Sequence, residues 1–142
     1  MNILVINGPN LNLLGERNHE IYGDNTLDEL MMWLETSPEG SNHNFKFYQS
    51  NHEGVIIDSI HDERQWAQGM IINAGALSHY SYSIRDAISS AKIPTVEVHL
   101  SDIMNREDFR KISVLKDVCV NQVYGMGKQS YIEGLRILNG NQ

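Results

Sequence analysis

Short apolar runs separated by longer amphipathic stretches form the main pattern along the chain. The run at residues 3–6 has no polar position, which is typical of a strand that is covered on both faces of a sheet. Further short stretches with the composition of strands follow at residues 45–47, 70–72, 95–98 and 118–123. The pattern therefore predicts five strands, spread over the whole chain.

Helical spacing fills the segments between these runs. Thr26 and Glu29 form a capping box, because the threonine caps a helix and the glutamate three residues later reaches back to it. Apolar residues then recur on one helix face until Pro-Glu-Gly at 38–40 ends the helix. Other helices or helical turns are predicted at residues 55–60, 81–91, 106–111 and 129–138.

Strands that alternate with helices predict an α/β fold. We expect residues 1–142 to form a single domain, a flavodoxin-like three-layer sandwich with a five-stranded parallel sheet. In such sheets the ligand binds beyond the carboxyl ends of the strands, near the point where the strand order reverses. The segments after the first, third and fourth strands are therefore the places to look for a site.

Polar residues gather in those three segments. The loop at residues 7–23 is long for a strand-to-helix connection and carries asparagines, an arginine and a tyrosine. Asn73 and His79 follow the third strand, while Glu97 and His99 lie two residues apart on one face of the fourth. Each also fits a structural role, since asparagine is common in loops and a strand-end histidine can be a hydrogen-bonded core residue.

Composition narrows the range of functions. The net charge of −7 argues against nucleic acid as a partner, because binding phosphate backbones needs a basic face. The one cysteine, Cys119, allows no internal disulfide and fits a small core residue. No signal peptide and no run of about 20 apolar residues are present, so we expect a cytoplasmic protein with no membrane partner.

Nucleotide and metal motifs do not fit. The first strand is not followed by a glycine-rich dinucleotide motif, and the glycines at 125 and 127 before Lys128 lack the spacing and the Ser/Thr of a phosphate-binding loop. The histidines lack a partner four residues away on a helix, and His61 is expected on an exposed helix face. We therefore expect no metal site.

Several motifs along nearly the whole chain resemble the type II 3-dehydroquinate dehydratases. The opening loop reads Asn-Gly-Pro-Asn-Leu-Asn-Leu-Leu-Gly-x-Arg and then Tyr-Gly, as in that family. Segments after each of the next three strands also match in order: residues 49–54, 73–86, 97–101 and 106–110. The resemblance implies a lyase that removes water from 3-dehydroquinate through an enolate, yielding 3-dehydroshikimate.

The resemblance also implies residue roles. Tyr22 would be the base that removes a proton next to the ketone, and Arg17 the cation that favours its phenolate. A phenol ordinarily loses its proton only near pH 10, so a base of this kind needs such a cation. The remaining roles are enolate stabilisation by Asn12, proton donation by His99 with Glu97 orienting it, carboxylate binding by Asn73 and the backbone of Leu100 and Ser101, and hydroxyl binding by His79 and Arg110.

The resemblance further implies assembly into trimers that form a dodecamer, with Asp86 reaching a neighbouring subunit's site, and no cofactor. The rival chemistry, a lysine Schiff base, belongs to TIM barrels of about 250 residues. This chain is too short for that fold, and its lysines avoid the strand ends.

Two departures from the family pattern stand out. Asn18-His19 replace Glu-Pro after the loop arginine, and Asp102 replaces an asparagine near the site for an anion. Three alternatives remain open: quinate breakdown, another lyase on the same fold, and a non-enzymatic flavodoxin-like binding module.

Overall fold

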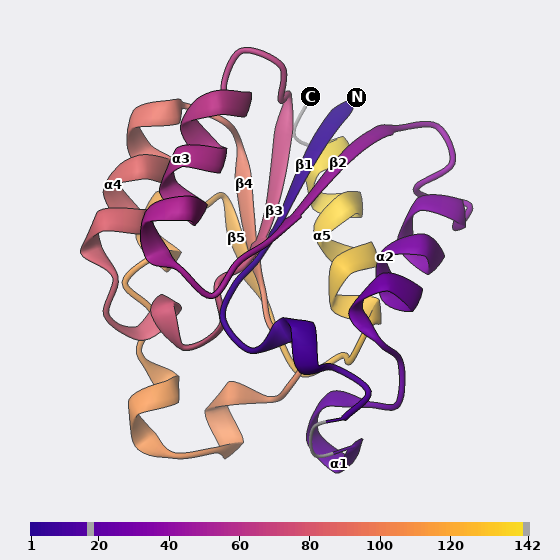
Figure 1. Cartoon of the computed structure of the whole chain (residues 1–142), viewed down its shortest axis with the longest axis vertical. Coiled ribbons are helices and arrows are strands. Elements are labelled where there is room, and N and C mark those ends of the chain that lie inside the picture. The colour runs from indigo at the N-terminus through magenta and orange to yellow at the C-terminus, as the bar shows by residue number, and fades with distance from the viewer. Residues whose placement is uncertain (17–18, 141–142) are drawn as a thin grey trace.

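A twisted sheet lies between two layers of helices, as Figure 1 shows for the computed structural model, which describes residues 1–16 and 19–140. The strands are all parallel in the order β2-β1-β3-β4-β5. They are β1 (Asn2–Asn7), β2 (Asn44–Gln49), β3 (Gly69–Asn73), β4 (Thr95–Val98) and β5 (Asn121–Val123). The expected α/β sandwich with a five-stranded parallel sheet is confirmed.

The two faces of the sheet are covered by different helix pairs. On one face lie α2 (Leu27–Thr36) and α5 (Gln129–Gly140), and on the other α3 (Glu53–Glu63) and α4 (Tyr82–Ala91). Alternate residues of β1 belong to the hydrophobic cores on the two faces of the sheet. Ile3 and Val5 pack with α2 and α5, whereas Leu4 and Ile6 pack with α3 and α4. This explains why β1 reads as a continuous apolar run.

Helix boundaries follow the sequence signals closely. Thr26 accepts a hydrogen bond from the Glu29 N–H, and the Glu29 side chain accepts from the Thr26 N–H, so the predicted capping box is present. Ser81 caps α4 by accepting from the Ile84 N–H at 3.1 Å. The α4 helix ends at Lys92, whose φ of 57° lies in the left-handed region.

The segment between β4 and α5 follows the predictions only in part. The strand expected at 118–123 is shorter, because Lys116–Val118 forms a 3-10 turn and Val118 and Cys119 pack against the core on the α3 and α4 side. The helical turn expected at 106–111 is present as the 3-10 turn Asp108–Lys111, and another 3-10 turn, Ile103–Asn105, precedes it. The side chain of Asp102 caps the start of the Ile103–Asn105 turn, where it accepts from the Met104 N–H at 3.2 Å.

The strand order reverses between β1 and β3, and the loops after these strands touch. Asn7 pairs with Asn73 in the ladder, and the Gly8 N–H donates to the Asn73 carbonyl at 2.7 Å. A Cβ at Gly8 would lie 2.5 Å from the Ala74 carbonyl oxygen, so only glycine allows this approach. The reversal thus brings the first and third loops together at the carboxyl edge.

Candidate active site

A pocket of about 110 Å³ opens at the carboxyl edge of β1, β3 and β4. Two arginines contribute to its wall, and none of the described residues that line it carries a carboxylate. A local positive field therefore suits an anion despite the net charge of the chain. Its polar lining comprises Asn10, Tyr22, Asn73, His79, His99, Ser101, Arg106 and Arg110.

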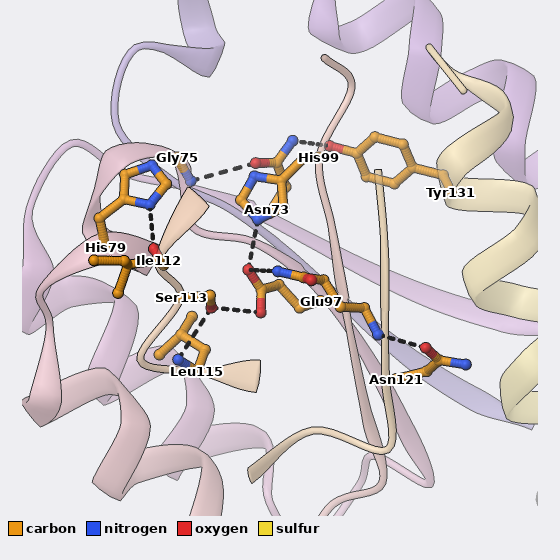
Figure 2. A network of polar contacts seen from close by, with 11 residues as sticks. Asn73, Gly75, His79, Glu97, His99, Ile112, Ser113, Leu115, Asn121 and Tyr131 are labelled. Carbon is orange, nitrogen blue, oxygen red and sulfur yellow. Dashed lines mark hydrogen bonds and ion pairs between the residues drawn. The ribbon is translucent and has the colours of Figure 1, made fainter. Parts of the chain in front are cut away.

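A buried ion pair stands at the end of β4. Glu97 is fully buried and His99 is 5% exposed, and the His99 Nε2 lies 2.5 Å from the Glu97 Oε2 (Figure 2). The His99 backbone N–H donates to the Val123 carbonyl at 2.9 Å, which holds the backbone from which the ring projects. Because Nε2 faces Glu97, Nδ1 is the ring nitrogen left to act on a ligand.

Three donors converge on the Glu97 carboxylate. Ser113 Oγ donates to Oε1 at 2.7 Å, and Gln122 Nε2 donates to Oε2 at 3.2 Å beside the contact from His99. Burial alone would raise the pKa of Glu97, but the hydrogen bonds and the charge of His99 outweigh it, so this pKa lies below its ordinary value. The carboxylate is therefore ionised and accepts a hydrogen bond from the His99 Nε2.

His79 is held as a neutral ring. Its Nδ1 lies 2.7 Å from the Ile112 carbonyl, which can only accept, so Nδ1 carries the proton (Figure 2). Burial lowers the pKa of His79, and the nearby His99 and Arg110 lower it further, while the bond to Ile112 and the charge of Glu97 oppose them. At neutral pH Nε2 thus offers a lone pair, which suits binding of a hydroxyl.

Tyr22 meets an arginine across the pocket wall. Tyr22 ends the four-residue helix α1 (His19–Tyr22), and the Arg106 Nη1 donates to its hydroxyl at 2.9 Å and to the Ser101 Oγ at 3.1 Å. The Arg106 side chain is 17% exposed. A partly buried guanidinium that donates to a phenol oxygen stabilises negative charge on that oxygen.

Backbone donors line the same pocket. Within the described part of the chain, the N–H groups of Leu100 and Ser101 donate to no protein acceptor. Asn73 lies beside them, with its Nδ2 donating to the Tyr131 hydroxyl at 3.0 Å and its Oδ1 accepting from the Gly75 N–H at 3.3 Å. N–H groups grouped in this way bind anions without a basic surface.

Some predicted residues lie elsewhere. Asn12 is exposed in a neighbouring hollow and accepts from the Gln49 Nε2 at 3.4 Å. Asp86 is exposed on α4 and does not line the pocket. Arg110 does line it, with its Nε 3.2 Å from the Glu107 carboxylate. Arg17 lies outside the described residues.

Arg106, Ser113, Gln122 and Tyr131 received no role from the sequence. Arg106 stands in a motif that matches the family, and its position near the motif's Arg110 was a usable signal. The other three reach the site from the segment before β5, from β5 and from α5. Their contacts depend on how these segments pack, which spacing along the chain does not report.

The two departures have local explanations. His19 links the ends of its loop, since its Nε2 lies 2.7 Å from the Gly15 carbonyl and its Nδ1 lies 3.0 Å from the Asp24 carboxylate. The Asp102 carboxylate accepts from the Met104 N–H at 3.2 Å and the Asn105 Nδ2 at 2.5 Å. Asp102 therefore directs its charge into its own turn. It does not line the pocket.

The described residues hold neither a cluster of metal ligands nor a membrane-spanning helix. Among residues 1–16 and 19–140, no group of three or more His, Cys, Asp or Glu is arranged to hold a metal ion. Over the same residues, no helix has both the length and the apolar character needed to cross a bilayer.

Comparison with known proteins gives a consistent result. Residues 1–139 match the family described as dehydroquinase class II. The 3-dehydroquinate dehydratase of Trichodesmium erythraeum is 51% identical over 137 residues, covering 96% of this chain and 91% of that protein. The enzyme of the same name from Caldicellulosiruptor saccharolyticus is 52% identical, with 96% and 94% covered. The crystal structure of a type II dehydroquinase from Butyrivibrio crossotus superposes with a TM-score of 0.94 at 46% identity, covering 98% and 97%.

Proposed function

This chain belongs to the class II dehydroquinase family, and from that premise we propose how its own residues perform the reaction. The protein is a lyase, a 3-dehydroquinate dehydratase, which converts 3-dehydroquinate to 3-dehydroshikimate in the shikimate pathway. The reaction needs a base for a proton next to a ketone, donors for the enolate and an acid for the departing hydroxyl.

Tyr22 is the base. The hydrogen bond from Arg106, at 2.9 Å, is the observation that carries this assignment, because it stabilises the phenolate that must remove the proton. Arg17 supplies a second cation on the strength of the family motif. The electrons of the broken C–H bond move into the ketone, and the phenolate becomes a phenol. Asn12 lies in the hollow beside the pocket and helps to hold the resulting enolate through an ordered water.

His99 is the acid. Its Nδ1 gives a proton to the departing hydroxyl, which leaves as water while the enolate electrons form the new double bond. The ionised Glu97 at 2.5 Å supports the charged ring before this step, and Nε2 keeps its proton afterwards. Tyr22 and His99 both line the pocket, so base and acid act on one bound molecule.

The substrate is held by neutral groups and by one cation, Arg110. Asn73 and the N–H groups of Leu100 and Ser101 bind its carboxylate, while His79 and Arg110 bind ring hydroxyls. The elimination transfers no electrons to or from an external group, and hydrogen bonds stabilise the enolate. The reaction therefore needs no cofactor.

Residues 1–142 act as a single catalytic domain, in a cytoplasmic dodecamer built from trimers. Asp86 fits this arrangement, because it is exposed on α4 and available to the site of a neighbouring subunit. Sedimentation at micromolar concentration should give a species larger than a trimer. A monomer alone would contradict the assembly without affecting the assignments within one chain.

The test is product formation from 3-dehydroquinate, followed by the ultraviolet absorbance of the conjugated product, with no metal or nucleotide added. Tyr22→Phe should lower kcat at least about 100-fold, because a general base contributes 10²–10⁴-fold. Tyr124→Phe removes the hydroxyl of a tyrosine that does not line the pocket and is the matched control. A Tyr22→Phe enzyme with wild-type kcat would rule out the assigned base.

A further inference from the structure

We propose that Tyr131 of α5 is a positioning residue that fixes which face of the Asn73 amide is presented to the substrate carboxylate. This inference rests on the proposed role of Asn73. It adds a residue from α5, one that touches no substrate because it does not line the pocket. Figure 2 shows the Tyr131 side chain extending from its helix to the Asn73 amide.

The contact belongs to a buried chain of hydrogen bonds. The Tyr131 hydroxyl lies 2.6 Å from the Asn7 Oδ1 and 3.0 Å from the Asn73 Nδ2. Tyr131 is fully buried, and Asn7 and Asn73 are 1% and 3% exposed. Water therefore cannot replace a lost partner within this chain, which makes each contact decisive for orientation.

The direction of each hydrogen bond that links Asn7, Tyr131 and Asn73 is determined. The Asn7 Oδ1 can only accept, so the single proton of the Tyr131 hydroxyl must point to it. The phenol oxygen then accepts from the Asn73 Nδ2, and the Asn73 Oδ1 accepts from the Gly75 N–H. Burial raises the pKa of Tyr131, so this phenol keeps its proton at any pH at which the enzyme works.

Only one orientation of the Asn73 amide satisfies these partners. If the amide turned over, its oxygen would face a phenol whose proton is engaged with Asn7, and its nitrogen would face the Gly75 N–H. Two hydrogen bonds would be lost. In the observed orientation one N–H of Nδ2 is used by Tyr131, and the second remains to donate to an anion.

The helix that carries Tyr131, α5, is itself held rigidly against the sheet. A Cβ at Gly134, three residues later on α5, would lie 3.2 Å from Val98 Cγ1 and 3.5 Å from Val96 Cγ1. The helix thus packs directly on β4, and the Tyr131 ring has little freedom to follow a moving amide. Orientation is imposed by α5 on Asn73, because the helix is held by packing that does not involve the site.

Tyr131→Phe removes the hydroxyl and keeps the ring. We expect KM for 3-dehydroquinate to rise about tenfold, with kcat changed less than about threefold, because carboxylate binding is similar in the ground and transition states. Tyr48→Phe is the matched control: it also removes a phenol bonded to a partly buried partner, Glu63 at 2.7 Å, but far from the pocket. Its KM should equal that of the wild type.

A double-mutant cycle distinguishes positioning from general destabilisation. If Tyr131 acts through Asn73, Tyr131→Phe should leave KM unchanged in an Asn73→Ala background. An unchanged KM in the single variant, an equal rise in both backgrounds, or an Asn73→Ala enzyme with wild-type KM would each overturn the proposal. A wild type that forms no product would instead refute the proposed function.

If Tyr131→Phe fails to fold, Asn7→Leu tests the same series of hydrogen bonds by changing the residue at its other end. Leucine fits beside the Met31 sulfur, which lies 3.5 Å from the Asn7 Nδ2, and removes the acceptor of the phenol proton. The proton can then turn toward Asn73, whose amide must flip to accept it. KM should rise as in Tyr131→Phe, and a wild-type KM in a folded Asn7→Leu enzyme would overturn the proposal.

Discussion

Individual side chains at this site are controlled by what lies behind them. Glu97 accepts from three donors, His79 donates a hydrogen bond to a backbone carbonyl, and the Arg106 guanidinium is shared between Tyr22 and Ser101. For His79 and His99, one ring nitrogen is engaged by these contacts, which determines the nitrogen that is left for a ligand. Protonation and tautomer are therefore properties of the surrounding contacts.

Glu97→Gln tests whether the contacts of Glu97 control the behaviour of His99. The amide keeps the size of the carboxylate but offers one acceptor atom where three donors converge, and it removes the charge that supports His99. We expect kcat to fall at least about 100-fold and the free energy of unfolding to drop by about 1–3 kcal/mol. Steady-state kinetics and urea unfolding measure the two effects.

The exposed Glu35→Gln should change neither quantity, and it controls for the loss of one negative charge. A Glu97→Gln enzyme with kcat within about threefold of the wild type would mean that the general acid does not depend on this carboxylate.

Helices and strands were predictable where a local signal determines them. The capping box at Thr26, the proline before β4 and the continuous run of β1 each act within a few residues, so these elements begin where expected. The stretch 118–123 was harder to predict, because Val118 and Cys119 pack against the core on the α3 and α4 side and the strand begins at Asn121. Such contacts join residues that no local pattern relates.

Lys92→Gly tests a local signal at the end of α4. The lysine holds a φ of 57°, which is unfavourable for a residue with a Cβ. Glycine removes that cost but also adds freedom to the unfolded chain, so we expect a net gain of about 0.5–1 kcal/mol in the free energy of unfolding. Urea unfolding measures it.

Lys116→Gly is the matched control, because φ at Lys116 is not positive. This substitution should destabilise the protein. Stabilisation by both glycines, or by neither, would show that the conformation of Lys92 is not the cause.

The whole molecule brings together what the sequence predicts only in part. The pattern of strands and helices predicted the α/β sandwich and the edge at which the site would lie, and the family motifs predicted the reaction. The motifs also predicted roles for Tyr22, Asn73, His79 and His99, and all of these residues line one pocket. The supporting contacts of Arg106, Gln122 and Tyr131 required the arrangement of the elements, because they join residues as far as 124 positions apart.

Acid stability is a prediction for the molecule as a whole. The bond from Tyr48 lowers the pKa of Glu63 despite its burial, and the contacts of Glu97 outweigh its burial to lower its pKa as well. Both carboxylates stay ionised in the folded state at pH values where the unfolded chain binds protons. Their stabilisation is therefore present above their ordinary pKa of 4.5 and is lost as pH falls through the lower folded values.

Unfolding by urea at a series of pH values should give a free energy that declines below about pH 4.5. Glu63→Gln should make the decline shallower, since one of the two groups no longer titrates. Glu133→Gln, at an exposed ion pair, should leave the slope unchanged. A wild-type free energy that is flat down to about pH 3 would contradict the assignment.

The close approach of Gly8 to Ala74 has a consequence for attempts to give the enzyme a new substrate. Any side chain at position 8 would push apart the two chain segments that contain Tyr22 and Asn73. Most variants in a library that changes Gly8 would therefore have a distorted pocket. Variation is better directed at Asn10 and Ala76, which line the pocket beyond the contact. The junction then serves as a fixed frame within which the specificity of the cleft can be redesigned.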